Sequence, residues 1–456
     1  MHDRLSRWTP AIFAAALVNL LLAELLLLSG VAWPATGLFA GPSLVMVHLA
    51  TIGWLTLLMF GALFQFVPVI TQNRLLHQNL SLATLLLLEL GLALMVSGFL
   101  LLGHGSGAAV ALPIGGAGVL GGIIVAVINL AVPLSRKHPW PLSARFIVAG
   151  FCFLGLTLLL GIAYAIALTR PSVAPFTASL LGAGIEYHLF AGLGGWFTLT
   201  AIGVTYELLP MFMLAPHERG ALGSAVLASA LAGFVLAIGA GVAAAFVQPP
   251  VAAVLAVVEE IGRAGIAISV VLYLVDVVRL YRSRRRPQIE LHNRAAVGAF
   301  AGLTVALLLA LALAASGALA ARAPGLVLLV MLGWLSGLAV TQLYKIVPFL
   351  AWLKRFGKNL GKGKVPRVQD LVDEAKALPI FALWFAAVLI SVAGALAEIA
   401  IVVRLGDAVL FVATLLLVRE YWRAWRGHYA KGEPKAPSFP FMTKDIAHEH
   451  DRAARA

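Results

Sequence analysis

The chain has 456 residues, of which 61% are hydrophobic and 12% charged, and its mean hydropathy is +0.97. Soluble globular domains are about 45–50% apolar and about 25% charged, so this composition excludes a water-soluble fold. The formal net charge of +13 would also suit a nucleic-acid-binding protein. The basic residues gather between apolar stretches, however, as in polytopic membrane proteins, so no nucleic-acid partner is expected.

Twelve apolar stretches are long enough to cross a bilayer, which takes about 20 residues per helix. The sequence therefore predicts an all-α polytopic membrane protein, with one membrane domain over residues 1–425 and a cytoplasmic tail over 426–456. The lipid bilayer is its expected environment. We place the helices at roughly 10–31, 42–69, 80–103, 107–133, 143–168, 179–214, 220–247, 251–278, 295–320, 325–353, 377–398 and 401–425.

Basic residues are distributed very unevenly between the two sides of the predicted bundle. Of the 33 Lys and Arg, 28 lie on the side that holds both termini and the loops after every second helix. The opposite side holds only Arg170, Arg322 and Arg404, and Arg263 and Lys345 fall inside helices. Because cytoplasmic loops carry the excess of Lys and Arg, both termini are expected in the cytoplasm, in a bacterial-type inner membrane.

Three predicted helices share one sequence pattern. Their tryptophans are 142 and 138 residues apart, which leaves room for four helices each time and predicts repeats over about 10–133, 143–278 and 295–425. Offsets of 0, 7, 11 and 14 fall within about 60° on an α-helix, so these positions form one stripe that should face the protein interior. The shared positions are a Gly-Trp pair at Trp54, Trp196 and Trp334, then Thr56, Thr198 and Ser336, then Gly61, Gly203 and Thr341, then Gln65, Glu207 and Lys345, and finally Pro68, Pro210 and Pro348.

Three four-helix repeats, with an H-L-x₃-G-W opening at His48, resemble subunit I of the haem–copper oxidase superfamily. The closest likeness is to its short twelve-helix relatives, the NnrS-type haem proteins. The resemblance implies that His48 is an axial ligand of a haem b, and that His188 lies where oxidases carry a copper ligand. It does not extend to a complete three-histidine copper site. Oxidases take further ligands from segments that correspond to 221–247 and 325–353, and these contain no histidine here.

The spacing of the two histidines leaves two arrangements open. His48 precedes its tryptophan by six residues and His188 by eight, which places them on opposite flanks of the interior stripe. They can face each other across a bis-histidine haem, or both can point toward the third repeat helix, where Met331 is a candidate partner. His104 is expected at the outer end of a helix. The remaining histidines are expected to be solvated in cytoplasmic loops or tails: His2, His77, His138, His217, His292, His428, His448 and His450.

Charged residues inside helices suggest a proton or ion path. Lys345 and Glu207 share an offset and are expected to pair, unless Lys345 instead extends its ammonium to the cytoplasmic surface. Arg263 follows Glu259 by four residues and Glu260 by three, so one helical face can hold an ion pair with one carboxylate left over. Further intramembrane acids are Glu24, Glu89 and Glu186.

The expected function is that of a haem-binding membrane protein engaged in electron transfer or in handling nitric oxide or a related small ligand. A redox partner or other membrane subunits would then act with it. Two alternatives stay open. One is a transporter of an ion, a metal or haem that uses the charged residues above, and the other is a non-catalytic membrane subunit of a larger complex.

Overall fold

The computed structural model describes residues 6–104, 106–170, 172, 174–216, 220–359 and 365–428. Within these residues the chain is helical, without a β-strand, and twelve helices are long and apolar enough to cross a membrane. This confirms the predicted all-α polytopic membrane fold. The tail predicted for 426–456 lies outside the described residues from position 429 onward.

Each of the twelve predicted helices has a counterpart, with ends that differ by a few residues in most cases. Three spans are built from successive α- and π-helical pieces. In chain order the elements are α1 (Thr9–Ser29), α2 (Gly41–His48), η2 (Leu49–Thr56), α3 (Leu57–Thr71), α4 (Gln78–Leu100), α5 (Ala108–Ser135), α6 (Leu142–Thr169), α7 (Pro175–Ala183), α8 (Glu186–Leu189), η3 (Phe190–Thr198), α9 (Leu199–Met213), α10 (Gly220–Ala244), α11 (Pro249–Arg282), α12 (Leu291–Ala315), α13 (Leu319–Leu328), η4 (Leu329–Ser336), α14 (Gly337–Phe356), η5 (Gly357–Asn359), η6 (Val368–Leu371), α15 (Glu374–Ala397) and α16 (Ala400–Arg426).

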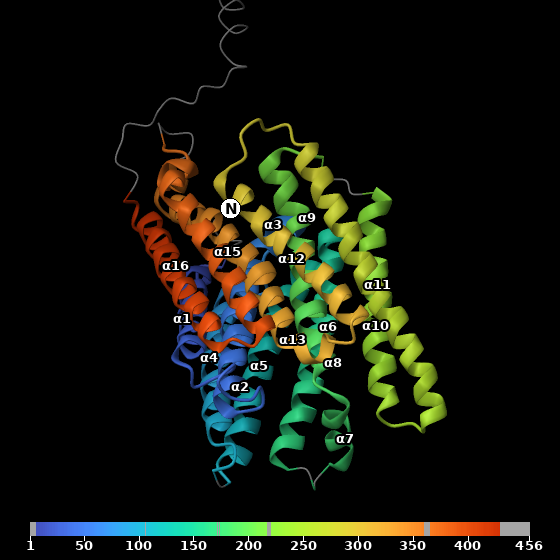
Figure 1. Ribbon diagram of the computed structural model, residues 1–456. Helices are drawn as coiled ribbons and strands as arrows, with labels where there is room; N and C mark the ends of the chain where they lie inside the picture. Colours follow the sequence, from blue (N-terminus) through green and yellow to red (C-terminus); the bar gives the residue numbers. More distant parts are fainter. Residues whose placement is uncertain are drawn as a thin grey trace, which may run out of the picture.

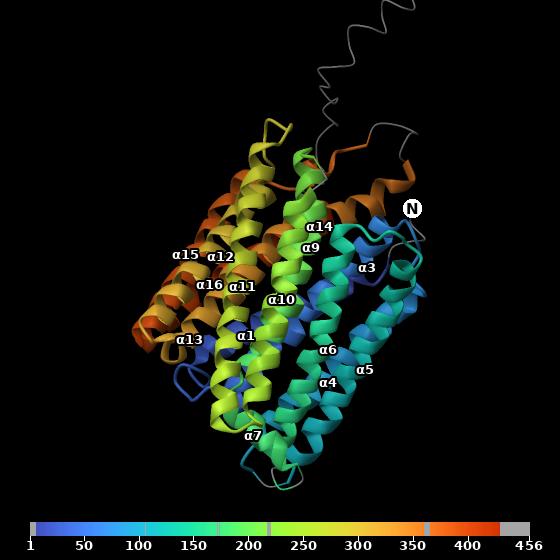
Figure 2. The same cartoon turned by 90° about the vertical axis from the view of Figure 1, so that its right-hand side faces the viewer.

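The bundle is assembled from antiparallel helix pairs around an inner layer. The pairs α4 with α5, α10 with α11 and α15 with α16 pack along their lengths (Figures 1 and 2). Glycine permits the closest approaches, because Gly91 on α4 lies against the backbone of α5 at Gly118, and Gly233 on α10 lies against α11 at Gly262. Small residues at helix crossings are typical of membrane bundles, where close backbone contact replaces the hydrophobic effect.

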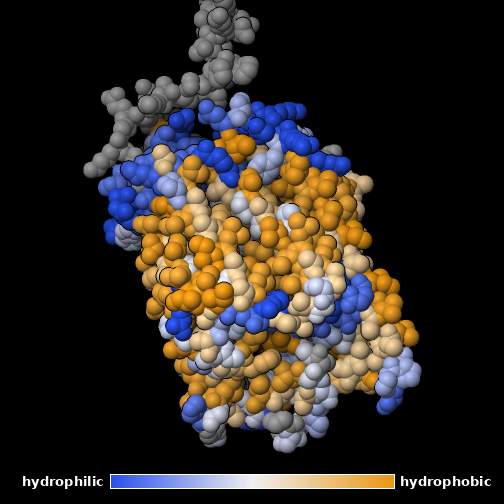
Figure 3. Space-filling view, viewed as in Figure 1, coloured by the Kyte–Doolittle hydropathy of each residue, from blue (hydrophilic) through white to orange (hydrophobic). Residues whose placement is uncertain are grey.

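The surface is polar at one end and largely apolar along the sides (Figure 3). The polar end, hereafter the basic end, holds the N-terminus, Arg74, Arg136 and Arg282–Arg286, where helices end or begin. Large apolar side chains such as Leu90 and Val254 are exposed on the outer helices. An exposed apolar girdle of this kind is the surface that a bilayer covers.

The three repeat helices are the most buried spans. In α2–η2–α3 and α8–η3–α9, 72% of an apolar 18-residue stretch is buried inside the protein, and in α13–η4–α14 the share is 61%. The other nine spans reach at most 50%. These three helices therefore form the inner layer, in agreement with the interior stripe predicted from their shared positions.

Each repeat helix contains a π-helical stretch at the same place. These stretches end at Thr56, Thr198 and Ser336, two residues after the shared tryptophans. A π-helix has more residues per turn than an α-helix, is rare, and is frequently found at functional sites. Directions calculated at 3.6 residues per turn therefore do not hold across this stretch. The predicted angular positions of His48 and His188 relative to their tryptophans need correction for that reason.

The helix predicted over 179–214 is wrong at its beginning. The helix is interrupted at Gly184, whose φ of 117° is accessible to glycine and strained for other residues. Tyr164 on α6 donates a hydrogen bond of 3.0 Å to the Gly184 carbonyl. The short helix α7 precedes the break, and α8 starts the span at Glu186. Glu186 and His188 consequently lie in the first turn of their span.

Candidate functional site

Three tryptophans close a ring of hydrogen bonds at the centre of the inner layer. The Trp54 indole Nε1 donates to Ser336 Oγ at 2.9 Å, Trp196 Nε1 donates to Thr56 Oγ1 at 3.4 Å, and Trp334 Nε1 donates to Thr198 Oγ1 at 3.3 Å. Each repeat helix thus donates to a second one and accepts from the third. All six side chains are buried, so the ring satisfies polar groups that would otherwise be unpaired inside a membrane.

The π-helical turns position the acceptors of this ring. Thr198 Oγ1 donates to the carbonyl of Leu193, five residues earlier, at 2.7 Å. That bond uses the only hydroxyl proton and leaves the oxygen lone pairs for the indole of Trp334. The shared Gly-Trp-x-Ser/Thr pattern therefore encodes a junction between the three repeat helices. Sequence reasoning found these residues but not their contacts.

His48 closes α2 with a fixed ring orientation. Its Nδ1 lies 2.7 Å from the Leu44 carbonyl oxygen, and its ring packs on Phe99 with centroids 4.6 Å apart. A carbonyl oxygen only accepts hydrogen bonds, so Nδ1 carries the proton and Nε2 has a lone pair in the neutral ring. This is the arrangement in which a second hydrogen bond orients a metal-ligating imidazole.

His188 lies on α8 and is partly buried against α6. A Cβ atom on Gly161 would come within 3.2 Å of His188 Cε1, so this glycine makes room for the ring. Tyr164 contacts the imidazole edge-on, with centroids 5.9 Å apart. Within the described part of the chain, the buried His188 Nδ1 has no hydrogen bond of normal geometry, although the backbone of Thr157 lies close enough to act on the ring. A buried nitrogen without a partner is costly in an apolar interior unless another group binds it.

The two histidines lie in the half of the bundle away from the basic end, near enough to interact electrostatically. One presents an oriented lone pair and the other a buried nitrogen without a partner, so these residues fit the axial ligation of a haem. Met331 is buried in η4 of the third repeat helix, and both arrangements expected from the sequence remain open. No group of three or more His, Cys, Asp or Glu suited to a bare metal ion occurs among the described residues.

The predicted pairing of Lys345 with Glu207 is wrong, because Lys345 pairs with Glu290. Its ammonium binds the Glu290 carboxylate, which also accepts from Arg286 and, at 2.9 Å, from Gln369. Glu207 accepts instead from Ser143 at 3.4 Å. Equivalent positions on three inner helices have the same depth without being in contact. The long lysine side chain therefore finds its partner at the N-terminus of α12, near the basic end.

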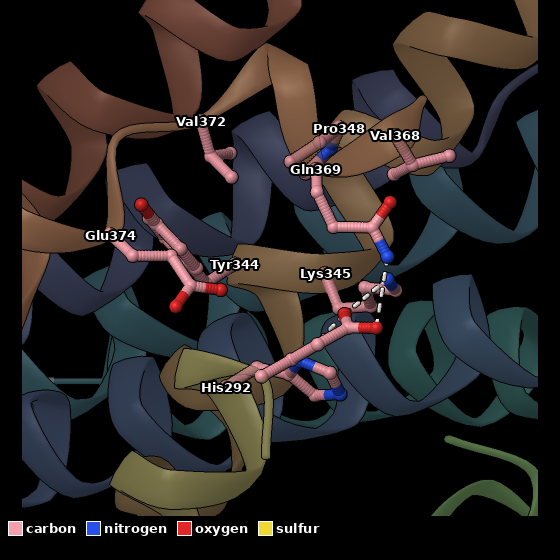
Figure 4. Close-up of a pocket in the computed structure, with 9 residues that line it drawn as sticks. His292, Tyr344, Lys345, Pro348, Val368, Gln369, Val372 and Glu374 are labelled. Carbon is pink, nitrogen blue, oxygen red and sulfur yellow. Dashed lines mark hydrogen bonds and ion pairs between the residues drawn. The ribbon is translucent and has the colours of Figure 1, made fainter. Parts of the chain in front are cut away.

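The Glu290 carboxylate is largely covered, with its side chain 11% exposed, but charged. Burial raises the pKa of Glu290, but the hydrogen bond and positive charge of Lys345, together with His292 and the hydrogen bond from Gln369, outweigh this effect and hold the pKa below its ordinary value. Lys345, Gln369 and His292 converge on one side of a small pocket, with Tyr344 and Glu374 on the other (Figure 4). The pocket joins α12, α14 and the segment around η6.

The expectation that His292 is solvated is wrong. It lies in the first turn of α12, is 2% exposed, and meets the ring of Phe212 edge-on with centroids 4.8 Å apart. Its Nδ1 lies 3.6 Å from Glu290. Helix α12 starts four residues earlier than predicted, so His292 belongs to a packed helix and not to a loop.

Arg263 forms the predicted ion pair on α11 and has a further partner on α8. It binds Glu259, Glu260 at 2.9 Å and Glu186 at 3.2 Å. Both α11 acids bind the same guanidinium, and with Glu186 three carboxylates share this one cation, so acid in excess of the cation is present as expected. Glu186 joins this cluster to α8, because it begins that helix two residues before His188. The cluster therefore lies in the half of the bundle away from the basic end.

No protein-family model matches the chain, and no curated protein matches it either. The likeness to haem–copper oxidase subunit I therefore stays a hypothesis, based on the His48 motif and the predicted repeats.

Proposed function

We propose that this chain is a haem-binding protein of a bacterial-type inner membrane, with its basic end in the cytoplasm. His48 would be an axial ligand of a b-type haem and His188 the second ligand or its near neighbour. The observation that supports this most directly is the oriented His48 imidazole together with the unpartnered, buried nitrogen of His188. The excess of Lys and Arg at the basic end supports the proposed orientation.

The surrounding residues have definite roles in this proposal. The Leu44 carbonyl holds the proton on His48 Nδ1 and so keeps Nε2 available, while Phe99 packs on the ring face. Gly161 leaves space for the His188 ring, and Tyr164 borders it. A haem would supply one-electron transfer or a position for a diatomic ligand such as nitric oxide. Two histidine ligands favour electron transfer, and one favours ligand binding.

The alternative of a transporter receives no specific support. Lys345 and Arg263 are the two intramembrane cations that would line its path. They are bound by carboxylates in opposite halves of the bundle. Fixed pairs of this kind hold helices together and do not define one continuous pathway.

A visible spectrum tests the proposal. Protein made in a haem-replete host should show a Soret band and reduced-minus-oxidised bands of a b-type haem. His48→Ala should lose the haem or change its spin state, and His188→Ala should do the same if the haem lies between the two rings. The exposed His104, near the same end, provides the matched control, and His104→Ala should keep the wild-type spectrum.

Two outcomes are informative in other ways. A loss confined to His48→Ala would place the second ligand elsewhere, with Met331→Ala the next variant. Monodisperse, helical protein without a Soret band would overturn the proposal.

A further inference from the structure

Two carboxyl groups are buried where the first and last spans meet. Glu24 on α1 is 2% exposed and Asp407 on α16 is 0% exposed. Helix α1 packs along α16, so this seam joins the first and third predicted repeats (Figure 1). The two acids lie within electrostatic range of each other. Glu24 is one of the intramembrane acids expected from the sequence, and Asp407 is an additional one.

In each carboxyl group, only one of the two oxygens has a hydrogen-bond partner among the described residues. Thr414 Oγ1 lies 2.8 Å from Glu24 Oε1, and Ser391 Oγ donates to Asp407 Oδ1 at 2.7 Å. The second oxygens, Glu24 Oε2 and Asp407 Oδ2, are buried without a hydrogen-bond partner in the described residues. A carboxylate normally accepts several hydrogen bonds, so one bond per group is too few for a stable buried charge.

Thr414 also gives a reason to place a proton on Glu24. Its oxygen lies 3.0 Å from the Leu410 carbonyl as well as 2.8 Å from Glu24. The hydroxyl has one proton, and a carbonyl oxygen can only accept. When Thr414 donates to Leu410, Glu24 must donate to Thr414, and it can do so only as the carboxylic acid.

No cation neutralises the pair in the part of the chain that the structure describes. The groups that face Glu24 are Thr414 and Asp407, and those that face Asp407 are Ser391 and Glu24. Arg404 precedes Asp407 by one turn of α16, but its guanidinium packs at Gly30, beyond the end of α1, and forms no ion pair with Asp407. Ionised acids inside a membrane cost several kcal/mol unless they are paired, roughly the cost that insertion scales give for Asp.

We propose that Glu24 and Asp407 form a proton-binding site at the α1–α16 seam. Each carboxyl group takes up a proton within the seam, and the unpartnered oxygens are the positions through which protons enter and leave. Thr414 and Tyr421 follow Asp407 at intervals of seven residues on the buried face of α16, about 10 Å apart along the helix. This polar stripe leads from the site toward the basic end. The site is separate from the histidines and does not depend on haem.

A hydrophobic carbodiimide tests the protonation state directly. Dicyclohexylcarbodiimide adds a protonated carboxyl across one of its C=N bonds, with the acid proton moving to nitrogen, and it does not react with a carboxylate in this way. In full-length protein in detergent at neutral pH, peptide mass spectrometry should find the adduct on Glu24, Asp407 or both. Exposed carboxyls are ionised there, because their pKa lies near 4. Glu290, charged and bound to Lys345, provides the internal negative control.

Near-isosteric variants give a second measurement. Glu24→Gln and Asp407→Asn keep an acceptor for Thr414 and Ser391, and each should lose its own adduct while helicity and elution volume stay unchanged. Infrared spectra of the wild type should show a protonated-carboxyl band that shifts in D₂O and weakens in each variant. The infrared arm uses unlabelled protein and so reports even if the reagent cannot reach the seam.

Three outcomes would overturn the proposal. The first is a wild-type infrared spectrum without a protonated-carboxyl band. The second is labelling of Glu290 as strong as that of the pair. The third is suppression of labelling by Na⁺ at constant pH, which would assign the site to a metal cation and not to the proton.

Discussion

Trp54 donates its indole N–H to the hydroxyl of Ser336, a residue 282 positions further along the chain. The two equivalent bonds from Trp196 and Trp334 complete a cycle. Each repeat helix therefore needs both of the others, one as hydrogen-bond acceptor and one as donor. The recurring sequence pattern therefore marks an interface as well as a helix type.

The ring should contribute measurably to stability. Trp54→Phe keeps most of the ring volume but removes the N–H donor, and we expect a loss of about 1–3 kcal/mol because the buried Ser336 hydroxyl loses its partner. Ser336→Ala should cost a similar amount, and the double variant should cost less than the sum. Unfolding in detergent measures these values. Trp140→Phe removes an indole bond to the Leu134 carbonyl outside the ring, and it should be additive with Ser336→Ala.

The partner of Lys345 can be established by double variants. Lys345→Met leaves the buried Glu290 with less compensation and should destabilise the protein by about 3–5 kcal/mol, the usual cost of breaking a buried pair. Adding Glu290→Gln should recover part of that loss, whereas Glu207→Gln should be additive. Unfolding of the six proteins in the two double-mutant cycles measures the coupling. Recovery with Glu207→Gln instead would contradict the pairing described above.

Acid should weaken the same contact. Burial raises the pKa of Glu290, but Lys345, with His292 and Gln369, outweighs burial and holds the pKa below its ordinary value of 4.5. A group with a depressed folded pKa contributes stability above its unfolded pKa and loses it as pH falls through the folded pKa. Wild-type stability should therefore fall below pH 4.5, and Lys345→Met should fall less over the same window. Parallel declines in a buffered thermal series would contradict this prediction.

We predict that a side chain at Gly161 would disturb the His188 ring, whereas one elsewhere on α6 would not. Gly161→Val would crowd His188 Cε1, and overpacking of this kind costs about 1–3 kcal/mol. If His188 is near the haem, the variant should also lose haem absorbance relative to protein. Gly155→Val, on the same helix, is the matched control, because nothing lies within 4 Å of a Cβ at Gly155. Equal effects of the two variants on spectrum and stability would remove the special role of Gly161.

The orientation of the bundle can be read with reporter fusions. Fusions after His428 or within the Arg282–Arg286 segment should be cytoplasmic, and a fusion at Gly317, between α12 and α13, should be external. The reason is the excess of Lys and Arg at the basic end. Activity of a periplasmic reporter at the Arg282–Arg286 segment would reverse the proposed orientation.

Much of the fold could be predicted because hydropathy and helix length depend on local sequence. The twelve spans, the inner position of the tryptophan helices and the Arg263 pair on α11 all follow from spacing along one helix. The break at Gly184 was missed because the glycine lies in an apolar run without other turn residues. The π-helical turns were missed because their sequence is ordinary for a membrane helix.

The parts of the site that escaped prediction depend on contacts between distant segments. Lys345 binds Glu290, 55 residues away, although a helical pattern gives only its depth and direction. Asp407 and Glu24 meet because α16 returns to α1, and no spacing rule connects them. His292 looked like a loop residue because polar neighbours hid the start of α12.

The closed tryptophan ring also constrains how the chain can be made. Trp54 enters the membrane early in synthesis, yet its acceptor, Ser336, is added only after most of the chain has been translated. Until then one indole N–H of the nascent protein has no native acceptor in the bilayer. A chain released after its second repeat would retain that defect permanently, together with a Thr198 hydroxyl that receives no indole. The ring thus distinguishes a finished protein from a truncated one.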